Sequence, residues 1–267
     1  MDQVKLCEKI NLALRHIIID DGKKVISSGT GIIINQKGYV LTAKHVVAAG
    51  GKPYPGNLIV TSPKSNQESK YVLFSDPNLS LSINYPDLLK PINIDLAILK
   101  PVSDIQTNFL ELYDGKAPIG TDVILAGYPD DVDIPLNFDE SFNLMNPDMT
   151  DMKKELDKRF IYYMRQPLFK KGMIGSMLSI HIEAPKQQIL IDGASYTIDT
   201  ELTYGGSGGP IVNMDGKLLG VIIRKGFTSA KKLQIQQMNQ GTIDKLPSGT
   251  GFGLSHDLIT GIYSQIF

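Results

Sequence analysis

The chain has 267 residues, of which 42% are hydrophobic and 21% are charged, a composition that excludes an intrinsically disordered protein. Its 27 basic and 28 acidic residues leave a formal net charge of −1, so the whole surface attracts neither nucleic acid nor an anionic membrane. The single cysteine, Cys7, excludes an intramolecular disulfide and a zinc site of two or more cysteines, and it favours a reducing compartment. The first residues lack the pattern of a signal peptide and no apolar run is long enough to span a bilayer, so we expect a cytoplasmic protein.

The first predicted element is a short amphipathic helix within residues 1–16. Leu6, Ile10 and Leu14 recur at four-residue spacing, which places them on one helical face, and Cys7 beside them is interpreted as core filler. From residue 17 the pattern becomes one of short β-rich runs separated by Gly, Pro, Asn and Asp. Strands are expected at 17–19, 25–26, 31–34, 39–42, 57–61, 71–74, 96–99, 123–126, 173–182, 188–191, 211–213, 218–224 and 251–255. Many short strands with little helix between them predict an all-β sandwich or a pair of barrels.

One segment, residues 130–166, departs from the β pattern. It opens with a run of acidic residues and becomes helical in character from about residue 148, where Glu155 and Arg159 are spaced as a weak helical ion pair. It is interpreted as a partly helical insertion. Two roles remain open, a surface embellishment and a regulatory or substrate-gating element.

The glycine-rich stretch from Tyr204 to Pro210 places Ser207 between two pairs of glycines. A serine hydroxyl becomes a useful nucleophile only when it is exposed to substrate beside a base. Flanking glycines permit a tight turn and let backbone N–H groups approach a developing oxyanion. The alternative is an ordinary glycine-rich turn between two strands.

Two further stretches favour the catalytic interpretation. His45 follows a predicted strand beside small and apolar residues, and Asp95 precedes the apolar strand at 96–99. Taken alone, the histidine could be a half-buried side chain and the aspartate a strand-start cap. Together with Ser207 they supply a base, an acid and a nucleophile in the chain order His45, Asp95, Ser207.

These stretches resemble the chymotrypsin-fold (trypsin-like) serine proteases, especially the disulfide-free bacterial HtrA/Deg-type branch. Matching segments follow one another in the family's order at 28–34, 38–47, 120–129, 171–176, 213–221 and 249–254. The resemblance implies two six-stranded antiparallel Greek-key barrels. We expect the first at 17–117 with His45 and Asp95, and the second at 118–267 with Ser207 and the insertion. The length leaves no room for the PDZ-type peptide-binding domain that the HtrA-like branch usually carries.

The mechanism implied by the resemblance is acyl transfer to Ser207. His45 is expected to act as general base and then general acid, while Asp95 holds the imidazole tautomer and stabilises the imidazolium. The oxyanion hole is expected at Gly205, Gly206 and Ser207, with the N–H groups of Gly205 and Ser207 as its donors. No cofactor or metal is implied.

Gly206 departs from the zymogen-type digestive proteases, which carry an aspartate at the residue before the nucleophile. Gly206 cannot pair with a newly cut N-terminal amine, and glycine leaves the loop free to adopt an inactive shape. The loop at 204–206 is therefore hypothesised to be ordered by substrate or by a partner. Lys44 also departs from the family, where a small residue normally precedes the histidine.

The specificity pocket is expected around five residues: Glu201, Tyr204, Ile223, Arg224 and Lys225. Glu201 lies six residues before Ser207, where trypsin-like members carry the acid that binds a basic substrate side chain. The two cations could instead pair with Glu201 or favour acidic substrates, while HtrA-like members have small apolar pockets. The preferred substrate side chain therefore stays open.

The sequence predicts a serine endopeptidase that acts on proteins or peptides. A regulatory protein or a larger assembly is expected as a further partner, and binding to nucleic acid or to a membrane is not expected. Two alternatives are kept: a catalytically silent binding module with the protease fold, and an acyl or ester hydrolase using the same three residues. The order with serine last argues against the α/β-hydrolase pattern, in which the serine comes first. The remaining histidines, His16, His181 and His256, show no metal-ligand spacing, and His256 with Asp257 is interpreted as a polar pair at a strand end.

Overall fold

The computed structural model describes residues 2–62, 68–75, 81–82, 91–92, 94–103, 105, 107–130, 166–184, 189–228 and 246–264. Helix α1 (Gln3–Ala13) runs directly into strand β1 (Leu14–Asp20), so the first barrel begins earlier in the chain than residue 17. The helix ends there because Leu14 adopts an extended backbone at the start of an isoleucine-rich run that is buried along its whole length. The insertion predicted at 130–166 lies outside the described residues except for its two end residues.

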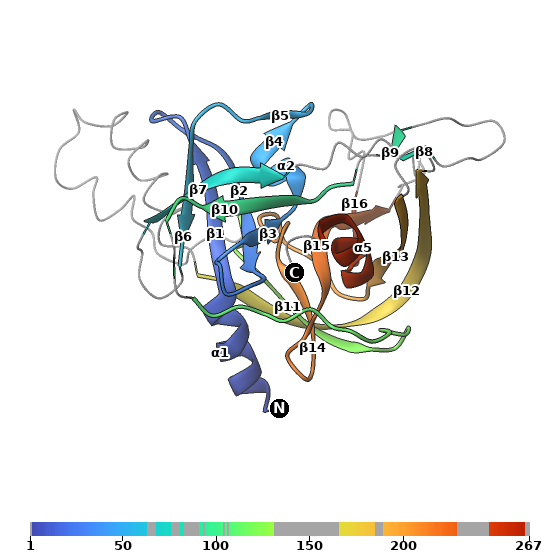
Figure 1. Ribbon diagram of the computed structural model, residues 1–267. Coiled ribbons are helices and arrows are strands. Elements are labelled where there is room, and N and C mark those ends of the chain that lie inside the picture. Colours follow the sequence, from blue (N-terminus) through green and yellow to red (C-terminus); the bar gives the residue numbers. More distant parts are fainter. Residues whose placement is uncertain are drawn as a thin grey trace, which may run out of the picture.

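Six antiparallel strands close the first barrel in the order β1-β2-β3-β10-β7-β6 (Figure 1). They are β1, β2 (Val25–Ile33), β3 (Val40–Thr42), β6 (Asn57–Thr61), β7 (Glu68–Ser75) and β10 (Ala97–Pro101). Alternate residues face opposite sides of a strand. In this barrel Ile33 and Val40 fill the interior, whereas their neighbours Ile32 and Leu41 pack in the core shared with the second barrel.

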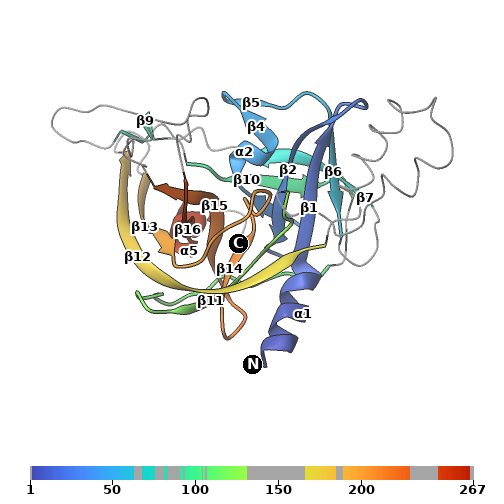
Figure 2. The ribbon, with the colours of Figure 1, turned by 180° about the vertical axis from the view of Figure 1, so that it is seen from behind.

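The second barrel closes in the order β11-β12-β13-β16-β15-β14. Its strands are β11 (Asp122–Gly127), β12 (Leu168–Ala184), β13 (Ile189–Ile198), β14 (Pro210–Asn213), β15 (Leu218–Thr228) and β16 (Leu246–Ser255). The predicted all-β fold with two six-stranded barrels is confirmed. Strands β12 and β13 form a long hairpin that arches beyond the other strands of this barrel (Figures 1 and 2).

Helix α1 and the C-terminal helix α5 (His256–Tyr263) both pack on the core between the barrels. Leu6 and Ile10 of α1 and Leu258 and Ile259 of α5 are fully buried there. The sequence interpretation missed α5, although its apolar residues recur at a helical spacing. The structure places His256 at the start of this helix, directly after β16.

Short elements complete the described chain. They are α2 (Lys44–Val47), the two-stranded pair β4 (Ala48–Ala49) and β5 (Lys52–Pro53), and the pair β8 (Leu81–Ser82) and β9 (Pro91–Ile92). Among the residues described, no helix has the length and apolar character needed to cross a membrane.

Candidate active site

His45 lies on α2, a one-turn helix that begins directly after strand β3 and its extended successor Ala43. The next two residues, Val46 and Val47, are buried in the interior of the first barrel and fix the turn. The His45 side chain itself stays 49% exposed. This part of the sequence therefore buries its valines and presents the imidazole at the surface.

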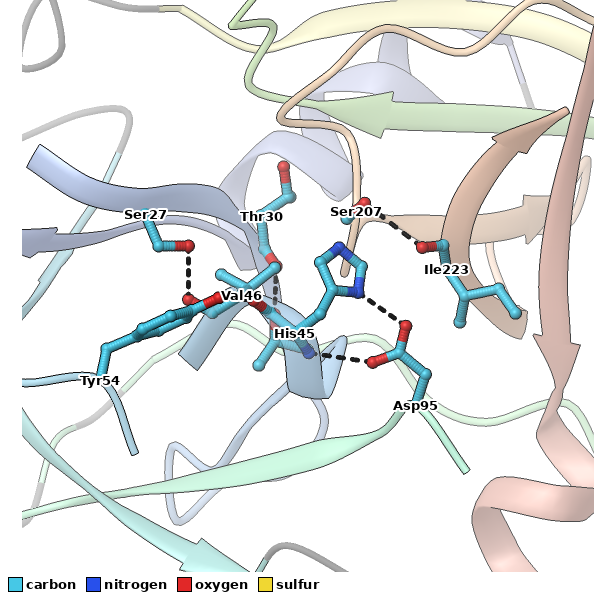
Figure 3. A network of polar contacts seen from close by, with 9 residues as sticks. Ser27, Thr30, His45, Val46, Tyr54, Asp95, Ser207 and Ile223 are labelled. Atoms are coloured by element: carbon cyan, nitrogen blue, oxygen red, sulfur yellow. Dashed lines mark hydrogen bonds and ion pairs between the residues drawn. The ribbon is translucent and has the colours of Figure 1, made fainter. Parts of the chain in front are cut away.

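Asp95 holds His45 at two points, as Figure 3 shows. One carboxylate oxygen lies 2.6 Å from Nδ1 of the His45 ring, and the other accepts the backbone N–H of His45 at 2.9 Å. The flanking residues Ile94 and Leu96 are buried, which anchors the aspartate. With Nδ1–H donated to the carboxylate, Nε2 of the neutral ring carries a lone pair and can accept a proton.

Ser207 lies in a glycine turn of the second barrel that is tied to the first barrel. Its carbonyl accepts the N–H of Thr30 in β2 at 2.8 Å. The next residue, Gly208, has φ +84°, and a Cβ there would lie 2.0 Å from the Thr30 carbonyl oxygen. Such close approach of two backbones requires glycine. The turn therefore sets Ser207 directly against β2.

The structure brings His45, Asp95 and Ser207 together, with the ring of His45 between the other two (Figure 3). The Ser207 hydroxyl donates to the carbonyl of Ile223 at 3.3 Å. Within the described part of the chain, Nε2 of His45 has no hydrogen-bond partner. Ile223 lies at a bulge in the pairing of β15 with β16, between Ile222 and Arg224. In this state the hydroxyl is directed at β15, and rotation of the serine side chain is needed to reach the imidazole.

The loop at 204–206 is fixed by hydrogen bonds to two of its carbonyl groups. The N–H of Asp130 donates to the Tyr204 carbonyl at 2.8 Å, and the Thr30 hydroxyl donates to the Gly205 carbonyl at 2.8 Å. The Gly206 N–H donates to the Thr203 carbonyl at 3.3 Å. Among the described residues the N–H groups of Gly205 and Ser207 have no acceptor, so they remain available to an oxyanion.

Gly205 occupies a position that only glycine fits. Its φ is +79°, and a Cβ would lie 2.1 Å from the Tyr128 carbonyl oxygen. At Gly206 a Cβ would meet its nearest neighbour, the Thr203 carbonyl oxygen, at 3.1 Å. The two adjacent glycines therefore differ in how strictly the fold requires them.

The five residues predicted for the specificity pocket lie on the loop before Ser207 and on β15. Nζ of Lys225 is 4.1 Å from the ring centroid of Tyr204, and the Arg224 guanidinium lies over the ring of Phe252 at 5.1 Å. Both are cation–π contacts. The exposed Glu201 forms no ion pair with either cation; its backbone carbonyl accepts Nζ of Lys170 at 2.7 Å.

A cavity of about 500 Å³ borders His45 and Asp95. Its wall includes Lys44, Tyr54 and Ile94 together with the small residues 48–51. The Tyr54 hydroxyl donates to the His45 carbonyl at 3.2 Å. Tyr54 and Thr30 were both missed by sequence reasoning. Thr30 lies in the matching segment 28–34, but no single residue of that segment was given a role.

Tyr128, whose carbonyl oxygen faces Gly205, has a buried side chain. The rings of His16 and Tyr128 stack with centroids 4.4 Å apart. Burial raises the pKa of the Tyr128 hydroxyl, which keeps the phenol neutral, and the nearby charge of Arg15 offsets only part of this effect. No group of three or more His, Cys, Asp or Glu side chains in the described ranges is arranged to hold a metal ion.

A family model described as a trypsin-like peptidase domain matches residues 29–221, a range that contains His45, Asp95 and Ser207. Three solved structures are similar over nearly the whole chain. The active form of the Rv3671c protease from M. tuberculosis has a TM-score of 0.59 and 19% identity, over 98% of this chain and 83% of that chain. The inactive form of the same protease has a TM-score of 0.56 and 17% identity, over 98% of this chain and 92% of that chain. The serine endoprotease from Yersinia pestis has a TM-score of 0.58 and 18% identity, over 99% of this chain and 66% of that chain.

At these identities the similar structures establish the fold. A comparison with curated protein sequences finds no match. The family assignment therefore rests on the domain model, which spans well over half of the chain.

Proposed function

We propose that this chain, which belongs to the trypsin-like peptidase family of serine proteases, is an endopeptidase that cleaves proteins or peptides with His45, Asp95 and Ser207. The observation that carries the proposal is the double contact from Asp95 to His45 beside the Ser207 turn. This contact fixes both the tautomer and the orientation of the imidazole, which a general base requires before it can activate a serine.

In the proposed reaction, Oγ of Ser207 attacks the substrate carbonyl carbon while its proton passes to Nε2 of His45. The N–H groups of Gly205 and Ser207 donate hydrogen bonds to the developing oxyanion, and one such donor contributes about 3 kcal/mol to transition-state stabilisation. His45 then gives the proton to the leaving amine, and an acyl group remains on Ser207. A water molecule, deprotonated by His45, releases the acid product and restores the serine.

The proposal includes control by the substrate. The Ser207 hydroxyl donates to the Ile223 carbonyl, an oxygen at a β-bulge of β15. A substrate strand that donates its own N–H to this carbonyl replaces the serine hydroxyl, which is then free to turn toward His45. Substrate binding and nucleophile activation are coupled in this scheme, and the element that responds to the substrate is the side chain of Ser207.

Matched phosphonates with and without a peptide segment test this coupling. Because binding energy from the peptide would be used to release the hydroxyl, the peptidyl reagent should label Ser207 at least about tenfold faster. Equal labelling rates would contradict control by the substrate and would leave the proposed cleavage reaction untouched.

A catalytically silent binding module is the second candidate, because the Ser207 hydroxyl is bonded to Ile223 and not to His45. Fluorophosphonate labelling separates the two candidates. The proposed enzyme incorporates the reagent at Ser207, and Ser207→Ala abolishes both labelling and digestion of a peptide library. A folded protein that binds peptides but takes up no label would support the silent module.

Parallel assays on peptide amides and simple esters address the third candidate, an acyl or ester hydrolase. Hydrolysis of esters with no cleavage of any peptide in the library would favour it. The same library defines the preferred substrate side chain, for which Glu201, Arg224 and Lys225 give opposing electrostatic preferences. The single cysteine supports the further proposal of a cytoplasmic location, which cell fractionation tests.

A further inference from the structure

Thr30 lies on β2 of the first barrel, yet it contacts the loop of the second barrel that carries the expected oxyanion donors. Its hydroxyl donates to the Gly205 carbonyl at 2.8 Å and accepts the N–H of Tyr128 at 2.9 Å. Its own N–H donates to the Ser207 carbonyl at 2.8 Å. The side chain is completely buried, so these protein groups are its partners instead of water.

We propose that Thr30 is a positioning residue that holds the oxyanion-hole loop in its competent shape from the opposite barrel. The inference rests on the proposed function, because it concerns the same acyl-transfer site. Thr30 touches no reacting atom and acts through the peptide groups of Gly205 and Ser207.

The need for such a contact follows from the two consecutive glycines. Gly205 and Gly206 lack a Cβ, so their backbone angles are weakly restricted by their own chemistry. Each peptide group is planar, and fixing its carbonyl also fixes the N–H on its other side. The Asp130 N–H fixes the peptide group between Tyr204 and Gly205, and Thr30 fixes the next one. With both planes fixed, the φ of +79° at Gly205 and the direction of its N–H are determined.

A second contact from the same strand supports this arrangement. Ser28, two residues before Thr30, donates its hydroxyl proton to a carboxylate oxygen of Asp130 at 3.1 Å. Residues two apart in a strand share a face, so Ser28 and Thr30 meet neighbouring parts of the second barrel. Nε2 of His16 lies 3.0 Å from the Ser28 oxygen and must be the donor there, because the only proton of that hydroxyl is already given to Asp130.

The test compares Thr30→Val with Thr30→Ser. Valine keeps the volume but leaves the Gly205 carbonyl and the Tyr128 N–H without their partner, whereas serine keeps the hydroxyl. We expect kcat to fall at least about tenfold in Thr30→Val with little change in KM, since misplaced oxyanion donors affect the transition state more than substrate binding. Thr30→Ser should recover most of the lost kcat.

Thr42→Val is the matched control. Thr42 is also fully buried, and its hydroxyl donates to the Thr30 carbonyl at 2.7 Å instead of to the oxyanion loop. It should lose a similar amount of thermal stability while keeping kcat within about threefold of the parent value. If Thr30→Val keeps the parent kcat, or if Thr42→Val loses kcat equally, the proposal is overturned and cleavage by Ser207 still stands.

An inactive parent protein would contradict the proposed function. The role of Thr30 in positioning the loop would then be tested without turnover. The amide signal of Gly205 in a ¹H–¹⁵N spectrum reports the geometry of the loop without any turnover. In Thr30→Val this signal should shift and broaden, and in Thr42→Val it should stay near its parent position. A Gly205 signal unchanged by Thr30→Val would overturn the inference.

Discussion

Two histidine–aspartate pairs in this protein have closely similar contacts and very different surroundings. Beside Ser207, Nδ1 of His45 lies 2.6 Å from a carboxylate oxygen of Asp95. On the β12–β13 hairpin, Nδ1 of His181 lies 2.5 Å from a carboxylate oxygen of Asp192. The hairpin pair is a cross-strand pair, since His181 and Asp192 are direct neighbours in the register. Its side chains are 55% and 74% exposed, against 49% and 32% for the pair beside Ser207.

The comparison shows what the proposed active site has beyond an imidazole–carboxylate contact. Asp95 also accepts the backbone N–H of His45, which fixes the whole residue and not only the ring. Beside His45 and Asp95 lie Ser207 and the N–H groups of its turn that have no acceptor among the described residues. All of these are supplied by the second barrel. The hairpin pair is more exposed, and its Asp192 borders a different cavity, of about 670 Å³. Variants at matched positions of the two pairs therefore separate catalysis from surface electrostatics.

The largest difference in kcat between matched variants is expected when the imidazole of each pair is removed. His45→Ala should lower kcat by on the order of 10⁵- to 10⁶-fold, because it removes the group that is proposed to take the proton of Ser207. His181→Ala should leave kcat within about twofold. Steady-state kinetics on one peptide substrate measures both variants, and comparable losses in the two would contradict the assignment of His45 as the base.

The next largest difference in kcat is expected when the aspartate of each pair is replaced by asparagine. Asp95→Asn should lower kcat by about 10⁴-fold, because an amide presents a donor to Nδ1 and favours the wrong tautomer. Asp192→Asn should leave turnover unchanged at the same pH. Activity retained in Asp95→Asn would show that the two-point contact with His45 is structural only.

A smaller effect is expected in the loop that precedes Ser207. A Cβ at Gly205 would meet the Tyr128 carbonyl oxygen at 2.1 Å, so Gly205→Ala must displace the loop and should lower kcat by about 10²- to 10³-fold. Gly206→Ala meets Thr203 at 3.1 Å and should lose at most about tenfold. Kinetics beside a thermal melt separates loop displacement from unfolding, and equal kcat values for the two variants would argue against a specific role for Gly205.

The smallest effect concerns stability at the hairpin. Both partners of the His181–Asp192 pair are more than half exposed, so His181→Ala should change the free energy of unfolding by less than about 1 kcal/mol. Chemical denaturation measures this change. A larger loss would mean that the hairpin pair has a structural role that its exposure does not suggest.

The sequence predicted those parts of the fold that depend on neighbouring residues. Alternating apolar runs and glycine-rich turns indicated the strands of both barrels, and the setting of His45, Asp95 and Ser207 in short local motifs marked them as candidates. The helical spacing within α5 was missed because the segment is short and follows a strand without a break. The end of α1 was placed too late because Leu14 continues the helical spacing while its backbone is already extended.

Other features depend on contacts between distant residues and left no local pattern. The Thr30 hydroxyl and the Gly205 carbonyl are separated by 175 positions. The hydrogen bond from Ser207 to Ile223 follows from a rotamer and a bulge that the sequence pattern does not specify. Arg224 and Lys225 each contact an aromatic ring, whereas the sequence analysis, which considered charge alone, left open pairing with Glu201 or a preference for acidic substrates.

The order of the strands also sets when activity can arise during synthesis. His45 and Asp95 belong to the first barrel, but Ser207 is held by a second barrel in which β16 (Leu246–Ser255) lies between β13 and β15. Domains generally fold in the order in which they leave the ribosome. The barrel that holds Ser207 therefore closes only after residue 255 has emerged. Under the proposed function, a growing chain therefore has His45 and Asp95 in place before the barrel that holds Ser207 is complete.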